Sequence, residues 1–237
     1  MNFSDIHIHA LFGSDDGARS AIDMKNIIDA AYNDGARYIC LTPHFHPGYY
    51  GENREKSAAA FSELSEYVGS TYDDLNIAIG NELYYTRGSE QWLRDGACRT
   101  LNKTNYVLVD FPLNEEKRTI DDAINRLLNA GYHPILAHVE RYRNLFSDIS
   151  FLFACKQRGA LIQIDSMSLF GAFGFKTKRF VSKILANRLA DFVSSDAHDT
   201  VKRPPKINCA YERIVKKYGK EYADKICFEN AKQMIFG

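Results

Sequence analysis

Short apolar runs alternate with longer amphipathic stretches along the whole chain. Runs of this length, bounded by polar and turn-forming residues, are typical of β-strands. The strands predicted in this way are Phe3–His9, Tyr38–Thr42, Ile77–Gly80, Tyr106–Phe111, Ile135–His138, Leu161–Asp165 and Phe192–Ser195.

Several stretches between these runs carry apolar side chains at the spacing of one helix face. The helices predicted from this spacing are Ala18–Asn33, Lys56–Val68, Thr119–Ala130, Phe180–Ala186 and Tyr211–Tyr218. Glycine stands where a helix should end and the next strand begin, at Gly35, Gly131 and Gly159. This punctuation is typical of a chain that repeats a strand–helix unit.

The repeat predicts one α/β domain that spans residues 1–237. We find no internal repeat, low-complexity tract or long linker that would divide the chain. About seven strand–helix units favour a closed barrel over an open doubly wound sheet. The absence of a GxGxxG fingerprint also argues against a dinucleotide-binding fold.

Positive and negative side chains balance, with 30 Lys and Arg against 30 Asp and Glu. A protein of this kind has no overall field that attracts nucleic acid or an anionic membrane. One basic stretch holds Lys176, Lys178, Arg179 and Lys183. A solvated helix face is the preferred explanation, and a docking surface for a partner or an acidic membrane is the alternative.

The five cysteines are scattered and show no Cys-x-x-Cys spacing. This pattern argues against a disulfide framework and against a zinc ribbon. Cys40 falls inside an apolar run, where a buried and unreactive thiol is expected. The N-terminus lacks a secretory signal pattern, and no apolar run approaches the roughly 18 residues of a membrane span. Together these features predict a cytoplasmic protein that does not span a membrane.

Ligand-type side chains gather at or just after the predicted strand ends. They are His7, His9, His44, Glu82, Asp110, His138, Asp196 and His198. In an α/β barrel these strand ends meet at one mouth, where active sites lie. With only seven histidines in the chain, such a concentration favours a metal site over packed histidines. His46 is a weaker candidate, and His133 is left out of the site.

His7 and His9 illustrate why the whole set is needed. They occupy alternate positions of one strand, so both imidazoles face the same side. Packing and ligation explain this pair alone equally well. The set exceeds the needs of one ion, and imidazole mixed with carboxylate favours manganese, iron or zinc.

The chemistry that fits such a cluster is phosphoryl hydrolysis, in which clustered divalent ions activate water and hold the reacting oxygens. Arg141 and Arg203 add fixed forks for phosphate oxygens, with surface ion pairs as the alternative explanation. The chain has no P-loop, no Gly-x-Ser-x-Gly elbow and no cysteine–arginine spacing of a thiol phosphatase.

Four segments carry a family resemblance: DIHIHALFGSDDGARS, GNELYYT, AHVERYRNL and SSDAHDTVKRPP. Together they resemble the PHP (polymerase and histidinol phosphatase) superfamily. More closely, they resemble the bacterial manganese-dependent protein-tyrosine phosphatases encoded with capsule and exopolysaccharide genes. The resemblance implies a single-domain, distorted (β/α)7 TIM-like barrel with three divalent ions at its mouth, Mn2+ foremost and iron or zinc as alternatives.

The resemblance also implies roles for individual residues. The expected ligands of the first ion are His7, His9, Glu82 and Asp196. Those of the second are Glu82, Asp110 and His138, and those of the third are Asp16, His44 and His198. Arg141 and Arg203 match arginines that contact the phosphate.

One residue and one segment depart from the family pattern. Asp110 stands where the family usually has glutamate, so it reaches the second ion by another geometry or through water. The segment 171–178, rich in glycine and phenylalanine, also differs and is expected to shape a distinctive rim.

The implied substrate is phosphotyrosine on the C-terminal tail of a membrane-associated tyrosine autokinase that controls polysaccharide export. The hypothesis is in-line attack by a metal-bridging hydroxide without a phosphoenzyme, with Asp196 or His198 as a candidate proton donor to the leaving group. Two alternatives stay open: a phosphatase of a small ester such as histidinol phosphate, and a non-catalytic, metal-stabilised docking module.

Overall fold

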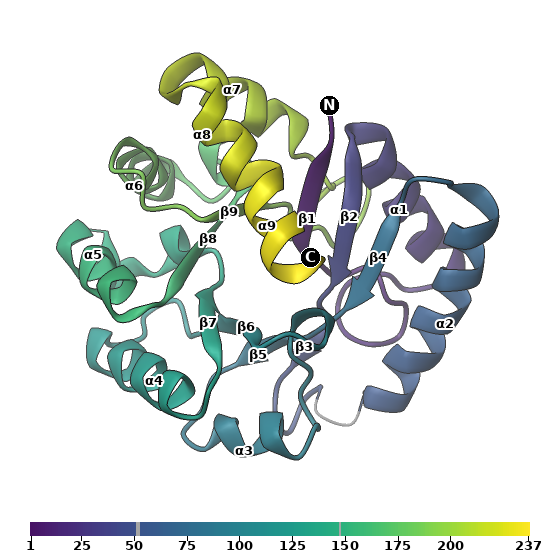
Figure 1. Ribbon diagram of the computed structural model, residues 1–237, viewed down its shortest axis with the longest axis horizontal. Coiled ribbons are helices and arrows are strands. Elements are labelled where there is room, and N and C mark those ends of the chain that lie inside the picture. Colours follow the sequence, from purple (N-terminus) through teal and green to yellow (C-terminus); the bar gives the residue numbers. More distant parts are fainter. Residues whose placement is uncertain (51–52, 147) are drawn as a thin grey trace.

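A curled, all-parallel sheet forms the centre of the computed structural model, which describes residues 1–50, 53–146 and 148–237 (Figure 1). Two hydrogen-bonded groups of strands make up this sheet, in the orders β1-β2-β4 and β3-β5-β6-β7-β8-β9. The strands are β1 (Phe3–Ile8), β2 (Ala36–Leu41), β3 (His44–Phe45), β4 (Asn76–Ile79), β5 (Glu82–Tyr84), β6 (Tyr106–Asp110), β7 (His133–Leu136), β8 (Leu161–Asp165) and β9 (Phe192–Ser194).

The two groups are one wall, because β2 runs on into β3 and β4 runs on into β5. Leu41 lies opposite Ile79, and three residues later on each strand His44 lies opposite Glu82, so the register does not change. Pro43 lacks an N–H and interrupts the first strand. Asn81 interrupts the second and donates its side-chain amide to the Pro43 carbonyl at 2.9 Å.

The wall closes on itself beside β1. The His9 N–H donates to the Ala197 carbonyl at 2.8 Å, and the Asp196 N–H donates to the His7 carbonyl at 2.9 Å. With β2–β3 and β4–β5 each counted as one strand, the barrel has seven strands, and a helix follows each. The predicted α/β barrel is confirmed.

The helices surround this wall (Figure 1). They are α1 (Ala21–Asp34), α2 (Arg54–Thr71), α3 (Ser89–Arg94), α4 (Lys117–Asn129), α5 (Ile149–Arg158), α6 (Phe175–Ala186), α7 (Asn208–Tyr218), α8 (Lys220–Asp224) and α9 (Asn230–Ile235). The predicted glycine stops are present: Gly35 and Gly159 adopt left-handed φ values of 114° and 107° and end α1 and α5. No helix in the described part of the chain is long and apolar enough to cross a membrane.

Several predicted boundaries are wrong. Helix α1 begins at Ala21 instead of Ala18, because the Ser20 hydroxyl accepts the Asp23 N–H at 3.1 Å and caps the helix there. Helix α6 begins at Phe175, one turn and more before the predicted Phe180. His138 lies beyond the end of β7 rather than in it. The sequence patterns also missed α3, α5, α8 and α9, whereas the predicted Tyr211–Tyr218 is the greater part of α7.

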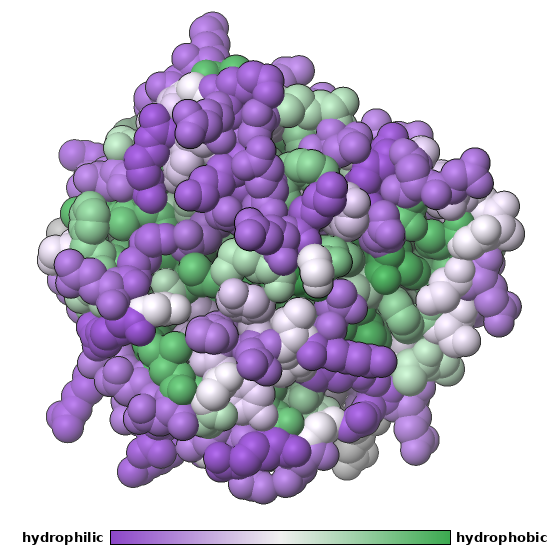
Figure 2. All heavy atoms as spheres, viewed as in Figure 1, coloured by the Kyte–Doolittle hydropathy of each residue, from purple (hydrophilic) through white to green (hydrophobic). Residues whose placement is uncertain are grey.

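Helix α9 closes the barrel at the end where the strands begin. Its Ala231 and Ile235 pack in one apolar cluster with Ile6, Ala78 and Phe192. The helix crosses the middle of the view in Figure 1, and Figure 2 shows this face mostly covered by hydrophilic side chains, with apolar ones between them. The opposite end, where the strands finish, remains available for the site.

The cysteines agree with the sequence prediction. All five are free thiols, and all but Cys209 are buried. Burial raises the pKa of Cys40 to about 12, which keeps this thiol protonated and unreactive at neutral pH.

Candidate metal centre

The ligand-type side chains converge at the carboxyl end of the barrel. They come from the strands or from the first residues after them: His7 on β1 with His9 just beyond, His44 on β3, Glu82 on β5, Asp110 on β6, His138 after β7, and Asp196 and His198 after β9. Most of these side chains are buried. The sequence therefore predicted their common location correctly.

Two imidazoles lie at the centre of this cluster with their Nε2 atoms facing each other. The Nδ1 of His7 lies 3.1 Å from Oε1 of Gln163, an oxygen that also accepts the His138 N–H. The Nδ1 of His9 lies 2.7 Å from the carboxylate of Asp15. Each Nδ1 is thus the donor, and the two Nε2 atoms lie 3.1 Å apart. Burial lowers the pKa of both rings, but Glu82 beside His7 and Asp15 beside His9 raise the pKa overall, so the surroundings favour a positive charge at these nitrogens.

Carboxylates surround the same two nitrogens. His7 Nε2 lies 3.2 Å from Glu82 and 3.3 Å from Asp196, and His9 Nε2 lies 3.4 Å from each of them. Such a set of lone pairs and negative charges in a buried space calls for a cation at its centre. The donors fit a divalent transition metal, because they are imidazole nitrogens and carboxylate oxygens.

Four overlapping groups of side chains have ligand atoms close enough to share an ion. They are His7–His9–Glu82, His7–His138–Asp196, Glu82–Asp110–His138, and His9–Asp16–His44–His198, with all ligand atoms of a group within 4.8 Å of one another. Glu82 links them: its oxygens lie 2.7 Å from His44 Nδ1 and 3.0 Å from His138 Nε2. Neighbouring groups therefore share ligand residues, Glu82 among them, and the cluster as a whole is able to bind metal.

Asp16 completes the group nearest the surface. Its Oδ1 lies 3.4 Å from Nε2 of His44 and 3.4 Å from Nε2 of His198. The Nδ1 of His198 faces the Asp196 carbonyl at 3.0 Å and is therefore the donor, which leaves the Nε2 lone pair directed at Asp16. Burial and the neighbouring His9 lower the pKa of His198, which favours the neutral, ligating form.

Asp110 lies beside His138 in the cluster. Its Oδ1 is 3.7 Å from His138 Nε2 and accepts the Tyr142 hydroxyl at 3.2 Å. Burial and the charge of Glu82 raise the pKa of Asp110 to about 7. This carboxylate thus belongs to the same group as Glu82 and His138, although it is shorter than the glutamate expected from the family.

The backbone is strained where two ligand-type residues leave their strands. His138 has φ 30° and Asp196 has φ 52°, both in the left-handed region that non-glycine residues rarely adopt. Strain of this kind persists only where the surroundings impose it, and it is common at functional sites. Here it turns both side chains back over the barrel mouth.

Arg141 and Arg203 meet at one oxygen of Asp196. Arg141 Nη2 lies 2.6 Å from Oδ2 of Asp196 and also bonds Asp165, and Arg203 Nη2 lies 2.5 Å from the same Oδ2. Oδ1 of Asp196 faces the imidazoles of His7 and His9. Burial alone would raise the pKa of Asp196, but Arg141 and His7 hold it well below its usual range. Two guanidinium groups are thereby held beside the ligand cluster.

The sequence analysis missed several buried residues that support the cluster. Asp15 orients His9 and also accepts the His44 N–H at 2.9 Å. Gln163 on β8 serves both His7 and His138. Glu140 accepts the Asp165 N–H at 2.9 Å, and burial together with Asp165 raises the pKa of Glu140 to about 7. The available signal was a polar residue within an apolar strand, as in Leu161–Asp165.

The remaining histidines lie outside the four groups. His46 stacks on Tyr84 with ring centroids 4.1 Å apart, and His133 is exposed at the start of β7, at the other end of the barrel. Tyr50 stacks on His44, with ring centroids 5.7 Å apart.

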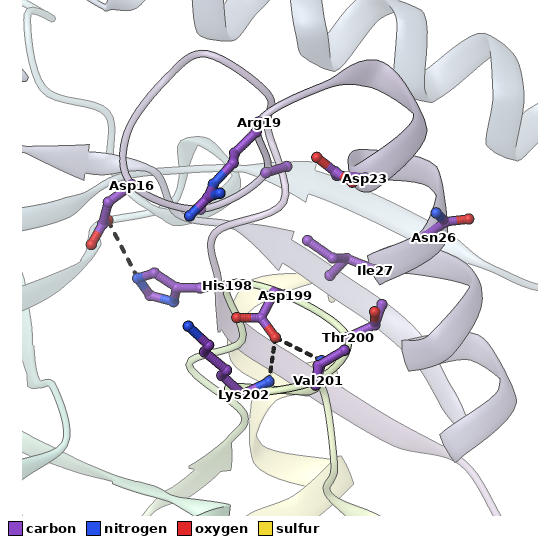
Figure 3. Close-up of a pocket in the computed structure, with 12 residues that line it drawn as sticks. Asp16, Arg19, Asp23, Asn26, Ile27, His198, Asp199, Thr200, Val201 and Lys202 are labelled. Carbon is purple, nitrogen blue, oxygen red and sulfur yellow. Dashed lines mark hydrogen bonds and ion pairs between the residues drawn. The ribbon is translucent and has the colours of Figure 1, made fainter.

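A cleft opens beside the outermost group (Figure 3). Its volume is about 360 Å³. Asp16 and His198 lie at one end, and Ile27 of α1 lies at the other. Arg19 and Lys202 bring positive charge to it, and Asp23 and Asp199 bring negative charge, so the cleft carries both signs.

Comparison with known proteins identifies relatives over nearly the whole chain. The family model described as "Capsular polysaccharide synthesis, CpsB/CapC" matches residues 3–236. Tyrosine-protein phosphatase CpsB of Streptococcus pneumoniae is 34% identical over 237 residues, which cover 98% of this chain and 97% of that protein. Tyrosine-protein phosphatase YwqE of Bacillus subtilis is 32% identical, with 98% and 91% covered.

Solved structures agree with these matches. A chain from the crystal structures of YwqE from Bacillus subtilis and CpsB from Streptococcus pneumoniae, described as metal-dependent tyrosine phosphatases, superposes with a TM-score of 0.85 at 32% identity. It covers 94% of this chain and 90% of that one. A histidinol phosphate phosphatase from Lactococcus lactis superposes with a TM-score of 0.58 at 16% identity, covering 92% and 95%, and shares the fold.

Proposed function

The chain belongs to the CpsB/CapC family of capsular polysaccharide synthesis proteins, and on that premise we propose that it is a metal-dependent tyrosine-protein phosphatase. The observation that carries the proposal is the pair of facing Nε2 atoms of His7 and His9, 3.1 Å apart among two carboxylates. A divalent cation among these nitrogens and carboxylates stabilises this arrangement, and two arginines lie beside it.

The proposed content is three divalent ions, with Mn2+ as the preferred metal and iron or zinc as alternatives. His7, His9, Glu82 and Asp196 would hold the first, Glu82, Asp110 and His138 the second, and Asp16, His44 and His198 the third. When bound, such ions lower the pKa of water and neutralise phosphate charge. Asp15 and Gln163 orient the ligating imidazoles through the opposite ring nitrogen, as carboxylates and carbonyls commonly do in metal sites.

Arg141 and Arg203 bind the phosphate of the substrate. The side chain of Arg203 is one-third exposed, whereas that of Arg141 is mostly buried, so Arg203 is the one that reaches out to an incoming ester. Their donors stabilise the charge on the equatorial phosphate oxygens as the reaction proceeds. A water oxygen bonds to phosphorus, the bond to the tyrosine oxygen breaks, and the products are inorganic phosphate and tyrosine.

Neither Asp196 nor His198 suits the role of proton donor to the leaving group. The oxygens of Asp196 face two guanidinium groups and two imidazoles, and its low pKa keeps it ionised. His198 has its proton on Nδ1, directed at a backbone carbonyl. Tyrosinate, with a pKa of about 10, is a moderate leaving group and depends less on an acid than a serine alkoxide.

The protein substrate is a phosphotyrosine polypeptide in the cytoplasm, and the C-terminal tail of a membrane-associated tyrosine kinase is the partner that the family resemblance implies. A small ester such as histidinol phosphate is the alternative substrate, but its support is a likeness of fold alone. A non-catalytic docking role does not explain why two arginines lie beside the ligand cluster.

The test combines metal analysis with a phosphatase assay. We expect the purified chain to contain bound divalent metal, to lose turnover of a phosphotyrosine peptide on chelation, and to regain it with Mn2+. His138→Ala should abolish turnover, whereas His133→Ala, the same change at the other end of the barrel, should not. Full activity of the chelated chain, or faster turnover of histidinol phosphate than of the peptide, would contradict the proposal.

A further inference from the structure

A second groove lies at Arg141 and shares no lining residue with the cleft of Figure 3. It measures about 430 Å³ and shares Arg141 with the metal centre. The ring of Phe173 lies on the guanidinium of Arg141, with Cζ 3.8 Å from the ring centroid. Anything bound to Arg141 therefore lies next to this groove, which we call the aromatic–basic groove; Arg141, Leu113, Arg143, Phe173, Phe175 and Lys176 form it.

Large apolar side chains are exposed along the groove. Phe175 is 78% exposed, Leu113 44% and Phe173 38%. They belong to a small set of large apolar residues that are exposed in the described part of the chain, and they come from two separate segments. Apolar side chains that gather at one exposed place mark a binding surface, because a partner that covers them removes apolar surface from water, which is favourable.

The charge of the groove has one sign. Arg143 and Lys176 form no ion pair with any described carboxylate, and none of the described residues that line the groove is acidic. Helix α6 also starts here without an acidic residue in its first turn, so its N-terminal dipole adds positive potential. In a chain with zero net charge, this excess is local. The cleft of Figure 3, by contrast, carries both signs.

We propose that the aromatic–basic groove binds the residues that flank phosphotyrosine in the protein substrate. A large apolar side chain packs against Phe173, Phe175 and Leu113, and one or more acidic side chains pair with Arg143 and Lys176. The inference rests on the proposed function, because it assumes that Arg141 holds the phosphate. It adds a preference that the metal centre cannot supply: apolar and acidic residues close to the phosphorylated tyrosine.

The segment 171–178, which the sequence analysis expected to shape a distinctive rim, supplies three of the groove residues. Phe173, Phe175 and Lys176 all belong to it. Gly171 and Gly174 adopt left-handed φ values of 91° and 94°, and these turns bring the two phenylalanines to the groove. The preference should thus be a property of this chain rather than of the metal chemistry.

The experiment compares three substrates: phenyl phosphate, a phosphotyrosine peptide with flanking leucine and glutamate, and the same peptide with serine in place of both. The wild-type chain with Mn2+ should show kcat/KM about tenfold higher for the first peptide than for the second. The double variant Arg143→Glu/Lys176→Glu should lower the ratio of kcat/KM on the first peptide to kcat/KM on phenyl phosphate by about tenfold, through a higher KM for the peptide. Phe175→Ser should lower the same ratio, because the leucine of the first peptide loses an apolar contact.

The matched control reverses two exposed lysines far from the groove, Lys216→Glu/Lys225→Glu, and should leave the ratio unchanged. Equal kcat/KM for both peptides would contradict the proposed role of the groove in substrate binding. Equal losses of kcat/KM on peptide and on phenyl phosphate in the groove variants would contradict it as well. Hydrolysis of phosphopeptides without preference refutes the groove and leaves the phosphatase intact. Failure to hydrolyse any phosphotyrosine substrate refutes both.

Discussion

The Nδ1 of His7 donates to the side-chain oxygen of Gln163 at 3.1 Å, and the same oxygen accepts the backbone N–H of His138 at 2.8 Å. One buried amide on β8 therefore holds two ligand-type residues that come from β1 and from the end of β7. It fixes the tautomer of His7, which directs the Nε2 lone pair into the cluster.

Gln163→Leu should lower the affinity for Mn2+ by about 10- to 100-fold, because His7 loses the acceptor that orients it. It should also destabilise the chain by about 1–3 kcal/mol, since the buried His138 N–H is left without a partner. Gln163→Glu keeps an acceptor and should retain more of the affinity. Calorimetric titration and urea unfolding measure both effects, and the exposed Gln91→Leu is the control. Wild-type affinity in Gln163→Leu would contradict the role.

The two arginines should respond differently to removal. Arg203→Ala should lower kcat on a phosphotyrosine peptide by about 10²–10³-fold, with little change in stability because the side chain is one-third exposed. Arg141→Ala should also cost about 3–5 kcal/mol of stability, since it leaves the buried Asp165 without its cation and Asp196 with Arg203 as its remaining guanidinium partner.

Kinetics and thermal unfolding of both variants separate these effects. Arg158→Ala, which removes a surface ion pair with Asp121, is the control and should change neither quantity much. Equal stability of Arg141→Ala and Arg203→Ala would show that Arg141 does not neutralise the buried carboxylates.

The barrel and its mouth could be predicted because local patterns encode them. Apolar runs and glycine stops such as Gly35 and Gly159 act over a few residues, and the strand ends then place His7, Glu82 and His198 together whatever their distance in sequence.

What escaped prediction depends on contacts between distant parts of the chain. Strands β3 and β5 have two and three residues, too few to show a period. Helix α9 depends on its packing against the end of the barrel. There the side chain of Asn102, distant in sequence, donates to the Ile235 carbonyl at 2.7 Å. Gln163 and Asp15 differ from other buried or loop polar residues only in their partners, which the sequence does not reveal.

Gly17 is required by the close approach of the loop after β1 to His9. A Cβ at this position would lie 1.9 Å from the His9 carbonyl oxygen and 2.7 Å from the His9 Cβ, both far inside van der Waals contact. Gly17→Ala should therefore displace His9 or the Asp15–Asp16 loop and weaken metal binding together with stability.

Gly69→Ala offers the matched control. Gly69 lies within α2, where an added Cβ meets no atom within 4 Å, so alanine should stabilise the chain by about 1 kcal/mol through helix propensity. Mn2+ titration and urea unfolding of both variants give the comparison. Wild-type metal affinity in Gly17→Ala would mean that the loop can move without disturbing His9.

The buried thiols should make the fold sensitive to high pH. Burial raises the pKa of Cys40 and of Cys155 from 9.0 to about 12. Between these values the unfolded chain releases protons that the folded chain keeps, so the folded state binds more protons and its stability falls as pH rises above about 9. Urea midpoints measured from about pH 8 to about pH 11 should decrease accordingly. Cys155→Ala should reduce the decrease, whereas Cys209→Ala, at a partly exposed thiol, should change it less. A midpoint that stays constant or rises over this range would show that the thiols are not buried as described.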